Sequence, residues 1–395
     1  MEKLEIALRF IAFLVKLKSS KRKIEKFRQS ADRYRIDTIH AASLDNNPLD
    51  SPADRDLRIY LPPGYHEKTN ERYPVIYFLH GYGSNNKSWT ITSRREIDQA
   101  PFPFDAIPAR MAREFNLDKI PTYEMLDELI TRGEIEPFIL VQPDGSLHLP
   151  RLGGGKDITG RPNVKGSFYV NSPHSGNYAD YIARDVVAHV DRNYRTLADP
   201  GHRAVSGASM GGYGAMYLGI KYPGVFGAVA SLAPGNLLWT MVDWKLYSPL
   251  YERLLGKRYA KKQGEHEWSD IVDTIDMIYS KDTPLVPSIK RDDAGKITSA
   301  SDAAIANWRK FDLSEMVNEH PGALKGKPVF IYVDAKDEFG LCPPTRQLHE
   351  TLLAHGIEHE FHNPDDPAVA ISPHVLGCGT NILPAFKFCS DAFKR

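Results

Sequence analysis

A serine framed by closely spaced glycines constrains this chain more than any other feature. The segment is Gly207-Ala208-Ser209-Met210-Gly211, which matches the G-x-S-x-G pattern of a nucleophile elbow. In such an elbow a strand turns sharply into a helix and exposes the serine hydroxyl at the turn. The flanks fit, because residues 202–205 read as a short buried strand and residues 210–222 as a helix. An ordinary glycine-rich turn is the alternative, but the flanks favour a nucleophilic Ser209.

Strand and helix patterns alternate along most of the chain. Apolar or alternating runs predict strands at 34–39, 57–61, 74–79, 138–143, 202–205, 226–232, 329–333 and 358–362. Amphipathic patterns predict helices at 123–130, 178–196, 210–222, 344–355 and from about 381 onward. This order predicts the α/β class, with a mostly parallel, doubly wound sheet and helices on both faces. Sites in such sheets lie at the C-terminal ends of the strands.

An acid and a histidine should follow the serine in the chain, because that is the order in folds with this elbow. Asp337 lies in a loop after a strand, and His374 lies in a predicted loop before the last helix. The histidine would take the serine proton, and the acid would orient the imidazole. Asp334 directly continues its strand, so Asp337 is preferred and Glu338 is the fallback. His362 lies on the last predicted strand and is expected to be structural.

A second loop, His80-Gly81-Tyr82-Gly83, also follows a predicted strand. A tetrahedral intermediate needs two backbone N–H donors, one from the residue after the nucleophile and one from an earlier loop. Met210 would supply the first donor, and Tyr82 or Gly83 the second. His80, Gly81 and Gly83 are expected to bind substrate.

Residues 237–325 interrupt the alternation of strands and helices. The segment is rich in aromatic residues, among them Trp239 and Trp244, which are expected to bind substrate. It would form a lid or acyl-binding wall, or else a helical subdomain that only adds stability. The expected organisation is an amphipathic helix at 1–30 and a catalytic domain at 31–395, with 237–325 inserted in it.

Composition excludes several classes of function. Fifty basic and fifty acidic residues cancel, so no global field favours nucleic acid. Three cysteines near the C-terminus, without metal-ligand spacing, predict unpaired thiols and a reducing compartment; one disulfide plus a free thiol is the alternative. Gly153-Gly154-Gly155 is not followed by Lys-Ser/Thr, so it is no phosphate loop. We expect no metal, no cofactor and a cytoplasmic protein.

The N-terminal segment has two interpretations. Residues 4–17 are mostly apolar, but Glu5, Arg9 and Lys16 make the apolar run too short to span a bilayer. Glu2 and Glu5 argue against a secretory signal. A helix here would either contact an anionic membrane surface or dock on the protein itself or a partner subunit. Docking is favoured, and the oligomeric state stays open.

Several segments taken together resemble the esterase-D-like branch of the α/β-hydrolases. This branch, which includes the carbohydrate esterase family 1 enzymes, contains feruloyl and acetyl-xylan esterases, S-formylglutathione hydrolases and mycolyltransferases. The similarity covers about residues 32–395 and is carried by the segments at 79–83, 136–145, 167–172, 176–181, 204–214, 222–229 and 337–339.

The resemblance implies an α/β-hydrolase fold and a serine carboxylic-ester hydrolase that works through an acyl-enzyme without a cofactor. It implies small-molecule or carbohydrate-linked esters as substrates, such as feruloyl or acetyl esters. Two alternatives stay open. One is acyl transfer of the mycolyltransferase type, in which an alcohol replaces water, and the other is a non-catalytic binding module on the same fold.

Overall fold

The structure is a computed structural model that describes residues 33–86, 122–147, 166–236, 278–279, 289–291, 297–337, 339–364 and 373–395. The expectations for residues 1–30, for Trp239 and Trp244 and for the fallback Glu338 concern residues outside these ranges. Within the described ranges, every helix is too short or too polar to cross a membrane.

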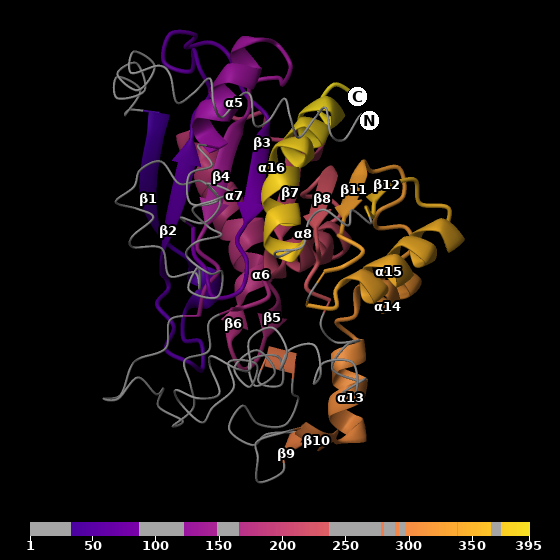
Figure 1. The fold of residues 1–395 in the computed structure, drawn as a ribbon. Helices are drawn as coiled ribbons and strands as arrows, with labels where there is room; N and C mark the ends of the chain where they lie inside the picture. Colours follow the sequence, from indigo (N-terminus) through magenta and orange to yellow (C-terminus); the bar gives the residue numbers. More distant parts are fainter. Residues whose placement is uncertain are drawn as a thin grey trace, which may run out of the picture.

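The described chain is built around an eight-stranded sheet (Figure 1). Its strand order is β1-β2-β4-β3-β7-β8-β11-β12. β1 pairs antiparallel with β2, and β2 pairs antiparallel with β4, while the pairs from β4 to β12 are all parallel. The bounds are β1 Tyr34–His40, β2 Asp54–Tyr60, β3 Val75–Leu79, β4 Ile139–Pro143, β7 Arg203–Ala208, β8 Ala228–Leu232, β11 Val329–Tyr332 and β12 Glu360–His362. The predicted α/β class and mostly parallel doubly wound sheet are confirmed.

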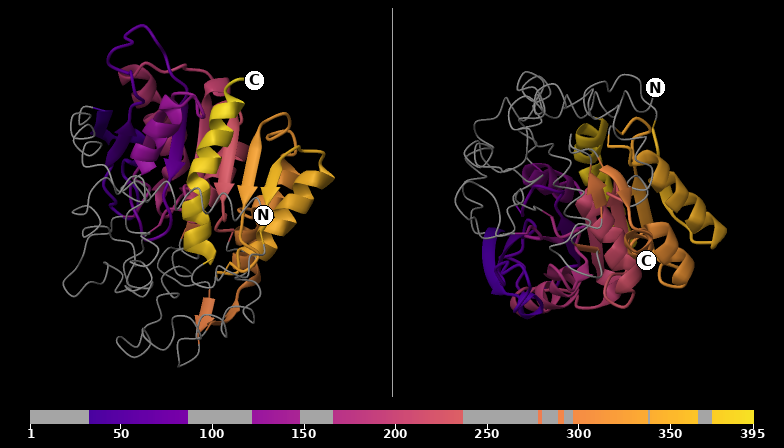
Figure 2. Two further views of the ribbon diagram at one scale, coloured as in Figure 1. Left: turned by 45° about the horizontal axis from the view of Figure 1, so that its top comes forward. Right: turned by 90° about the horizontal axis from the view of Figure 1, so that it is seen from below.

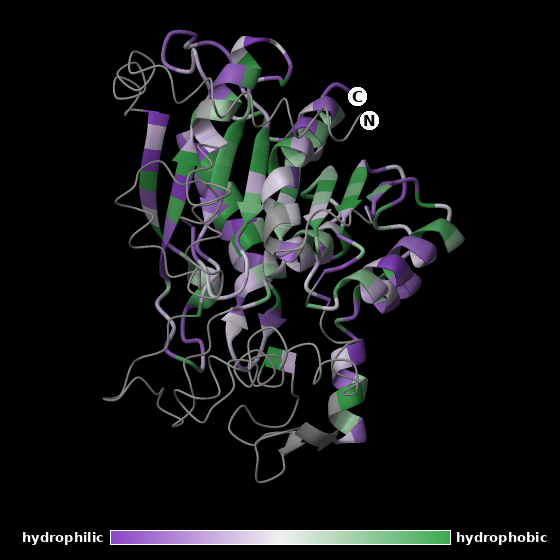
Figure 3. Cartoon of the chain, in the orientation of Figure 1, coloured by the Kyte–Doolittle hydropathy of each residue, from purple (hydrophilic) through white to green (hydrophobic). Residues whose placement is uncertain are grey.

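The central strands are apolar because both faces of the sheet are covered. Every residue of β3, β4, β7, β8 and β11 is buried. Figure 3 shows the result as a block of hydrophobic strands, whereas the edge strand β1 is mixed in character. Continuous apolar runs are what parallel strands between two helical layers require. The core therefore lies along the strands that lead into the site.

Helices cover the two faces of the sheet. The last helix, α16 (Pro373–Ala392), lies on one face, and α8 (Met210–Lys221) and α15 (Cys342–Ala354) lie on the opposite face (Figure 2). The other helical segments are α5 Thr122–Thr131, α6 Tyr178–Asp180, the π-helical η5 Tyr181–Val186, α7 Val187–Asn193, α13 Asp302–Arg309 and α14 Leu313–Glu319. Short strands β5 (Asn171–Ser172) and β6 (Gly176–Asn177) pair with each other, as do β9 (Ile289–Arg291) and β10 (Ile297–Ala300).

One boundary differs from expectation in a way that affects the site. The last helix begins at Pro373 instead of near residue 381, so His374 lies in its first turn and not in a loop. Proline suits the start of a helix, because the first N–H groups of a helix have no partner within it. Within this first part of the helix Gly377 serves packing, since a Cβ there would lie 2.3 Å from the hydroxyl oxygen of Tyr332.

Candidate active site

The backbone is strained at Ser209, between β7 and α8. Its φ and ψ angles are 60° and −119°, in a region that residues with a side chain rarely occupy. Hydrogen bonds to both the N–H and the carbonyl of Ser209 keep the residue in this strained conformation. The N–H of Ser209 donates to the carbonyl of Leu232 at 2.8 Å, and its own carbonyl accepts from the N–H groups of Tyr213 (3.0 Å) and Gly235 (2.9 Å). The Ser209 side chain stays partly exposed at the turn.

The two glycines of the motif are required by close backbone contacts. A Cβ on Gly207 would lie 2.3 Å from the carbonyl oxygen of Gly211. A Cβ on Gly211 would lie 2.0 Å from the carbonyl oxygen of Leu79, at the end of β3. Both distances are far below van der Waals contact, so any side chain would force β7, α8 and β3 apart. The G-x-S-x-G spacing therefore reflects how tightly the helix packs on the sheet.

His374 and Asp337 are joined by a buried hydrogen bond. Nδ1 of His374 lies 2.7 Å from Oδ2 of Asp337, and both side chains are buried. The other carboxylate oxygen of Asp337 accepts from the backbone N–H groups of Phe339 (2.9 Å) and Leu341 (3.4 Å). The ring of Phe339 packs edge-on against the imidazole, with centroids 4.8 Å apart. With its Nδ1 proton directed at the carboxylate, a neutral imidazole keeps Nε2 as its basic nitrogen.

The start of α16 and the elbow meet at the end of β8. The carbonyl oxygen of Leu232 accepts from Ser209 N–H and lies 4.0 Å from the sulfur of Cys378. Cys378 is one helical turn after His374, so the two share a face of α16. In Figure 1 the parallel strands end and α16 begins at the same edge of the sheet. Ser209 and the His374–Asp337 pair therefore lie at the same, C-terminal edge of the sheet.

The loop after β3 lies against the elbow. A Cβ on Gly81 would lie 3.6 Å from the Cβ of Ser209. A Cβ on Gly166 would meet both the sulfur of Met210 (2.5 Å) and the ring of Tyr82 (2.6 Å), so these two side chains flank the same point. Gly83 has a φ of 72°, which only glycine adopts without strain. The two segments expected to hold an oxyanion are thus neighbours.

His80 lies in the protein interior and holds this loop through hydrogen bonds of its ring. The ring is buried, and Nε2 accepts from the N–H of Gly145 at 3.0 Å, while Nδ1 donates to the carbonyl of Gly81 at 2.9 Å. The ring therefore ties the β3 loop to the β4 loop. This differs from the expected substrate contact of the side chain.

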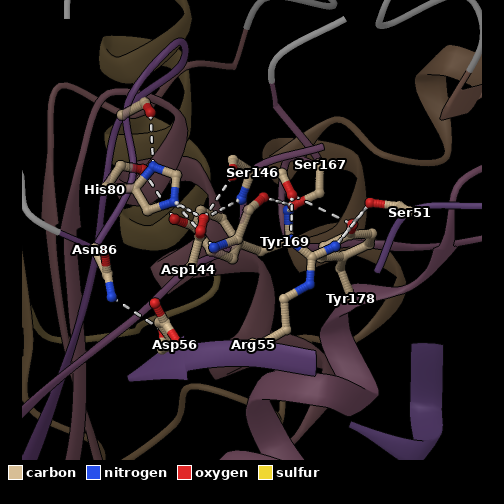
Figure 4. A network of polar contacts seen from close by, with 12 residues as sticks. Ser51, Arg55, Asp56, His80, Asn86, Asp144, Ser146, Ser167, Tyr169 and Tyr178 are labelled. Atoms are coloured by element: carbon tan, nitrogen blue, oxygen red, sulfur yellow. Dashed lines mark hydrogen bonds and ion pairs between the residues drawn. The ribbon is translucent and has the colours of Figure 1, made fainter. Parts of the chain in front are cut away.

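Figure 4 shows that the polar cluster extends from His80 through Asp144 to Arg55. Asp144 accepts from the N–H (3.0 Å) and the hydroxyl (2.6 Å) of Ser146. The buried Arg55 donates to the carbonyl of Ser146 (2.9 Å) and to the hydroxyl of Tyr178 (2.5 Å). The guanidinium also lies 5.3 Å from the centre of the Tyr178 ring. These bonds give partners to both terminal nitrogens of the buried guanidinium and connect the loops beside the elbow.

An aromatic wall lies beside the elbow. Phe168 contacts the rings of Tyr82 (6.1 Å between centroids) and Tyr213 (5.9 Å). Tyr279 stacks on Phe311 at 4.2 Å and also approaches Phe168. Phe168 has a φ of 52°, so its backbone is strained to place the ring here. Three of these residues lie outside the predicted insertion, so aromatic content alone could not have located the wall.

Asp334 and His362, the candidates set aside in the sequence analysis, have other partners. Asp334 is buried, and its carboxylate accepts from the N–H of Lys336 at 2.8 Å. His362 is on β12 with half of its side chain exposed, 3.6 Å from a Glu360 oxygen. Its ring packs on Phe330.

The sequence reasoning missed Gly235, Asn236 and Asp312. Gly235 bonds the Ser209 carbonyl, and Asn236 bonds Asp312. Their signals were the Pro234-Gly235-Asn236 turn after an apolar strand and the helix-capping pattern Asp312-Leu313-Ser314-Glu315.

Known proteins resemble this chain at the level of family and fold. The family model described as putative esterase matches residues 51–270, more than half of the chain. An endo-1,4-beta-xylanase/feruloyl esterase of Xylanibacter ruminicola is 25% identical over 183 residues, covering 46% of this chain and 19% of that protein. An esterase of Mycobacterium tuberculosis is 25% identical over 268 residues, covering 65% of this chain and 47% of that protein. The chain thus spans less than half the length of these relatives.

A solved ferulic acid esterase has the same fold, with a TM-score of 0.54 at 16% identity, over 91% of this chain and 98% of that one. With the strand order and the family match, this places the chain on the α/β-hydrolase fold. The chain therefore belongs to the putative esterase family.

Proposed function

We propose that this protein hydrolyses carboxylic esters through an acyl-enzyme on Ser209, with His374 as general base and Asp337 as its orienting acid. The observation that carries the proposal is the buried 2.7 Å hydrogen bond between His374 and Asp337, at the edge of the sheet where the strained Ser209 lies. A histidine in this arrangement is fixed in the tautomer that accepts a proton at Nε2.

The chemistry proceeds in two balanced steps. The Ser209 oxygen attacks the ester carbonyl carbon while Nε2 of His374 takes the hydroxyl proton. The tetrahedral intermediate then expels the alcohol, which leaves with that proton. In the second step His374 takes a proton from water, the resulting hydroxide attacks the acyl carbon, and Ser209 leaves with the proton as the carboxylic acid is released.

Negative charge on the carbonyl oxygen would be held by the N–H groups of Met210 and Tyr82. Met210 is the first residue of α8, where unpaired N–H groups and the helix dipole favour an anion. The β3 loop that carries Tyr82 lies against the elbow at Gly81. Loss of one such donor in hydrolases costs roughly 10²- to 10³-fold in rate.

The aromatic wall supports esters with a flat acyl group as the preferred substrates. Tyr82 is partly exposed beside the nucleophile, and its ring packs on the buried Phe168, which in turn packs on the buried Tyr213. The Tyr82 ring is thus held in place where it can pack against a flat acyl group. One relative and one structural neighbour are named as a feruloyl and a ferulic acid esterase, respectively. We therefore propose a phenolic-acid ester, free or linked to carbohydrate, ahead of a simple acetyl ester.

The test compares turnover of p-nitrophenyl esters of graded chain length with turnover of methyl ferulate. Wild-type protein should hydrolyse them, and Ser209→Ala should lose about 10⁶-fold in kcat, as expected when a whole triad loses its nucleophile. Ser43→Ala is the matched control, since only the backbone N–H of Ser43 makes the bond to Asp185. Ester hydrolysis that survives in Ser209→Ala would place the site elsewhere, and equal kcat/KM for all acyl groups would remove the phenolic preference.

A further inference from the structure

A buried bridge joins two distant segments just beside the elbow. The side-chain amide of Asn236 donates to Oδ2 of Asp312 at 3.0 Å, across 76 positions of sequence. The two side chains are almost fully enclosed, since Asn236 is 1% exposed and Asp312 is 2% exposed. A charge-assisted hydrogen bond between groups removed from water is stronger and more directional than one at the surface.

Asp312 has a second role at the start of α14. Its Oδ1 accepts from the N–H groups of Ser314 (2.9 Å) and Glu315 (3.2 Å), which caps the helix. Burial raises the pKa of Asp312, and the hydrogen bonds from Glu315, Asn236 and Ser314 oppose that shift. One carboxylate oxygen thus serves the helix, and the other serves Asn236.

Asn236 ends a short loop that supports the nucleophile directly. The preceding residue, Gly235, donates its N–H to the carbonyl of Ser209 at 2.9 Å. Earlier in the same loop, Ala233 has a strained φ of 43° and donates to the carbonyl of Tyr332 at 2.6 Å. The loop is therefore held at its start by β11 and at its end by Asp312.

The carbonyl of Ser209 and the N–H of Met210 belong to one planar peptide group. A bond that fixes the direction of the carbonyl also fixes the direction of the N–H on the opposite side of the plane. Gly235 thereby aims the Met210 N–H, which is the proposed oxyanion donor. A Cβ on Gly235 would lie 3.3 Å from the Met210 nitrogen, which shows how closely this loop covers the peptide.

We propose that Asn236 and Asp312 are positioning residues, whose hydrogen bond holds Gly235 on the Ser209 carbonyl and so orients the Met210 N–H for transition-state binding. The inference rests on the proposed function. It assigns a role to two residues that touch neither the substrate nor the reacting atoms.

A second contact ties the same segment to α8. The hydroxyl of Tyr213 donates to the carbonyl of Phe311, next to Asp312, at 2.7 Å. Burial raises the pKa of Tyr213 well above its ordinary value, so this hydroxyl stays a donor. The N–H of Tyr213 in turn donates to the Ser209 carbonyl at 3.0 Å. Two chains of hydrogen bonds therefore connect this segment to the Ser209 carbonyl. One runs from Phe311 through Tyr213, and the other runs from Asp312 through Asn236 and Gly235.

The test begins with Asn236→Ala, which removes the bridge but leaves the Asp312 cap of α14 intact. The expected result is a fall in kcat of about ten- to a hundredfold with KM changed by less than about threefold, because misorientation affects mainly the transition state. The rate at which a p-nitrophenyl phosphonate modifies Ser209 should fall in parallel. Asn193→Ala is the control, since Asn193 bonds only within α7 in the described structure.

Two further variants separate positioning from simple loss of stability. Asp312→Asn keeps an amide oxygen for the cap but sets two donating amide groups against each other, so it should match Asn236→Ala in kcat. The exchanged variant, Asn236→Asp with Asp312→Asn, restores a donor opposite an acceptor and should recover most of kcat. Melting temperature is measured for each variant, so that a folding defect is recognised.

The outcomes are distinct. Wild-type kcat in a folded Asn236→Ala variant would overturn the inference, as would an exchanged variant that regains its melting temperature but not its kcat. If wild-type protein neither hydrolyses esters nor reacts with the phosphonate, the proposed function itself fails and the inference fails with it.

Discussion

His374 lies in the first turn of α16, beside the acid that bonds it and one turn before a residue that touches the end of β8. His362 is held on an edge strand with half of its side chain in solvent. The two histidines thus differ in burial and in the partner of the ring. Burial beside a carboxylate suits a general base, and an exposed ring on an edge strand does not.

We expect His374→Ala to remove ester hydrolysis nearly as completely as Ser209→Ala, because the serine loses its proton acceptor. The double variant should be no slower than either single variant, since the residues act as one unit. His362→Ala should keep wild-type kcat and alter only the melting temperature, through its contact with Phe330. An active His374→Ala protein alongside an inactive His362→Ala protein would reverse the assignment.

Single residues were predictable where the chemistry demands one residue type at one place. Ser209 stands out because a Cβ at either flanking glycine would lie 2.0 to 2.3 Å from backbone oxygen atoms. Only glycine fits at these positions, and the resulting spacing can be recognised in the sequence. The buried hydrogen bonds of His80 could not be predicted, because nothing in the sequence indicates which groups surround a ring. Asn236 and Asp312 escaped notice for a similar reason: their partnership depends on two loops meeting in space.

At the scale of elements, the elbow joins three pieces of backbone more closely than side chains permit. Gly211→Ala would add a methyl 2.0 Å from the carbonyl oxygen of Leu79. Alanine would gain up to about 1 kcal/mol in helix propensity, but the clash is with backbone and should cost about 3 kcal/mol or more. We expect a destabilised protein with little activity, measured by denaturant unfolding and ester turnover.

Gly224→Ala is the matched control for this experiment. Gly224 is exposed in the turn after α8, and nothing lies within 4 Å of the position that a Cβ would take. Its substitution should change the free energy of unfolding by no more than about 0.5 kcal/mol. A Gly211→Ala protein as stable as the control would mean that helix and sheet have more room than the structure shows.

Elements with a strong apolar pattern were predicted well, whereas elements whose bounds depend on local packing or hydrogen bonding were not. The central strands followed from apolar runs, because burial on both faces leaves few polar positions. The start of α16 was missed by about eight residues. Glycine normally interrupts a helix, but within α16 Gly377 allows the ring of Tyr332 to approach. The predicted helix at 178–196 divides into α6, η5 and α7, a local change of hydrogen bonding that periodicity does not reveal.

At the scale of the whole molecule, all three cysteines are buried and unpaired, as predicted. Burial raises the pKa of the Cys389 thiol, which keeps it in the unreactive protonated form. We expect native protein to react slowly with Ellman's reagent and protein in guanidinium to release about three equivalents at once. Fast reaction of all thiols in the native protein would contradict the packing of α15 and α16 described here.

The position of α16 at the C-terminal end of the chain also has a consequence during synthesis of the protein. Phe386 of this helix packs against Phe78 of β3 and against Phe138 beside β4, so it covers apolar surface from strands made far earlier. The same helix brings the proposed base to the serine. A nascent chain that has produced the elbow but not residues 373–392 has a nucleophile without a base and an uncovered sheet face. With His374 as the proposed base, we expect hydrolysis to begin only once α16 has emerged, and prematurely ended chains to be both inactive and prone to aggregate.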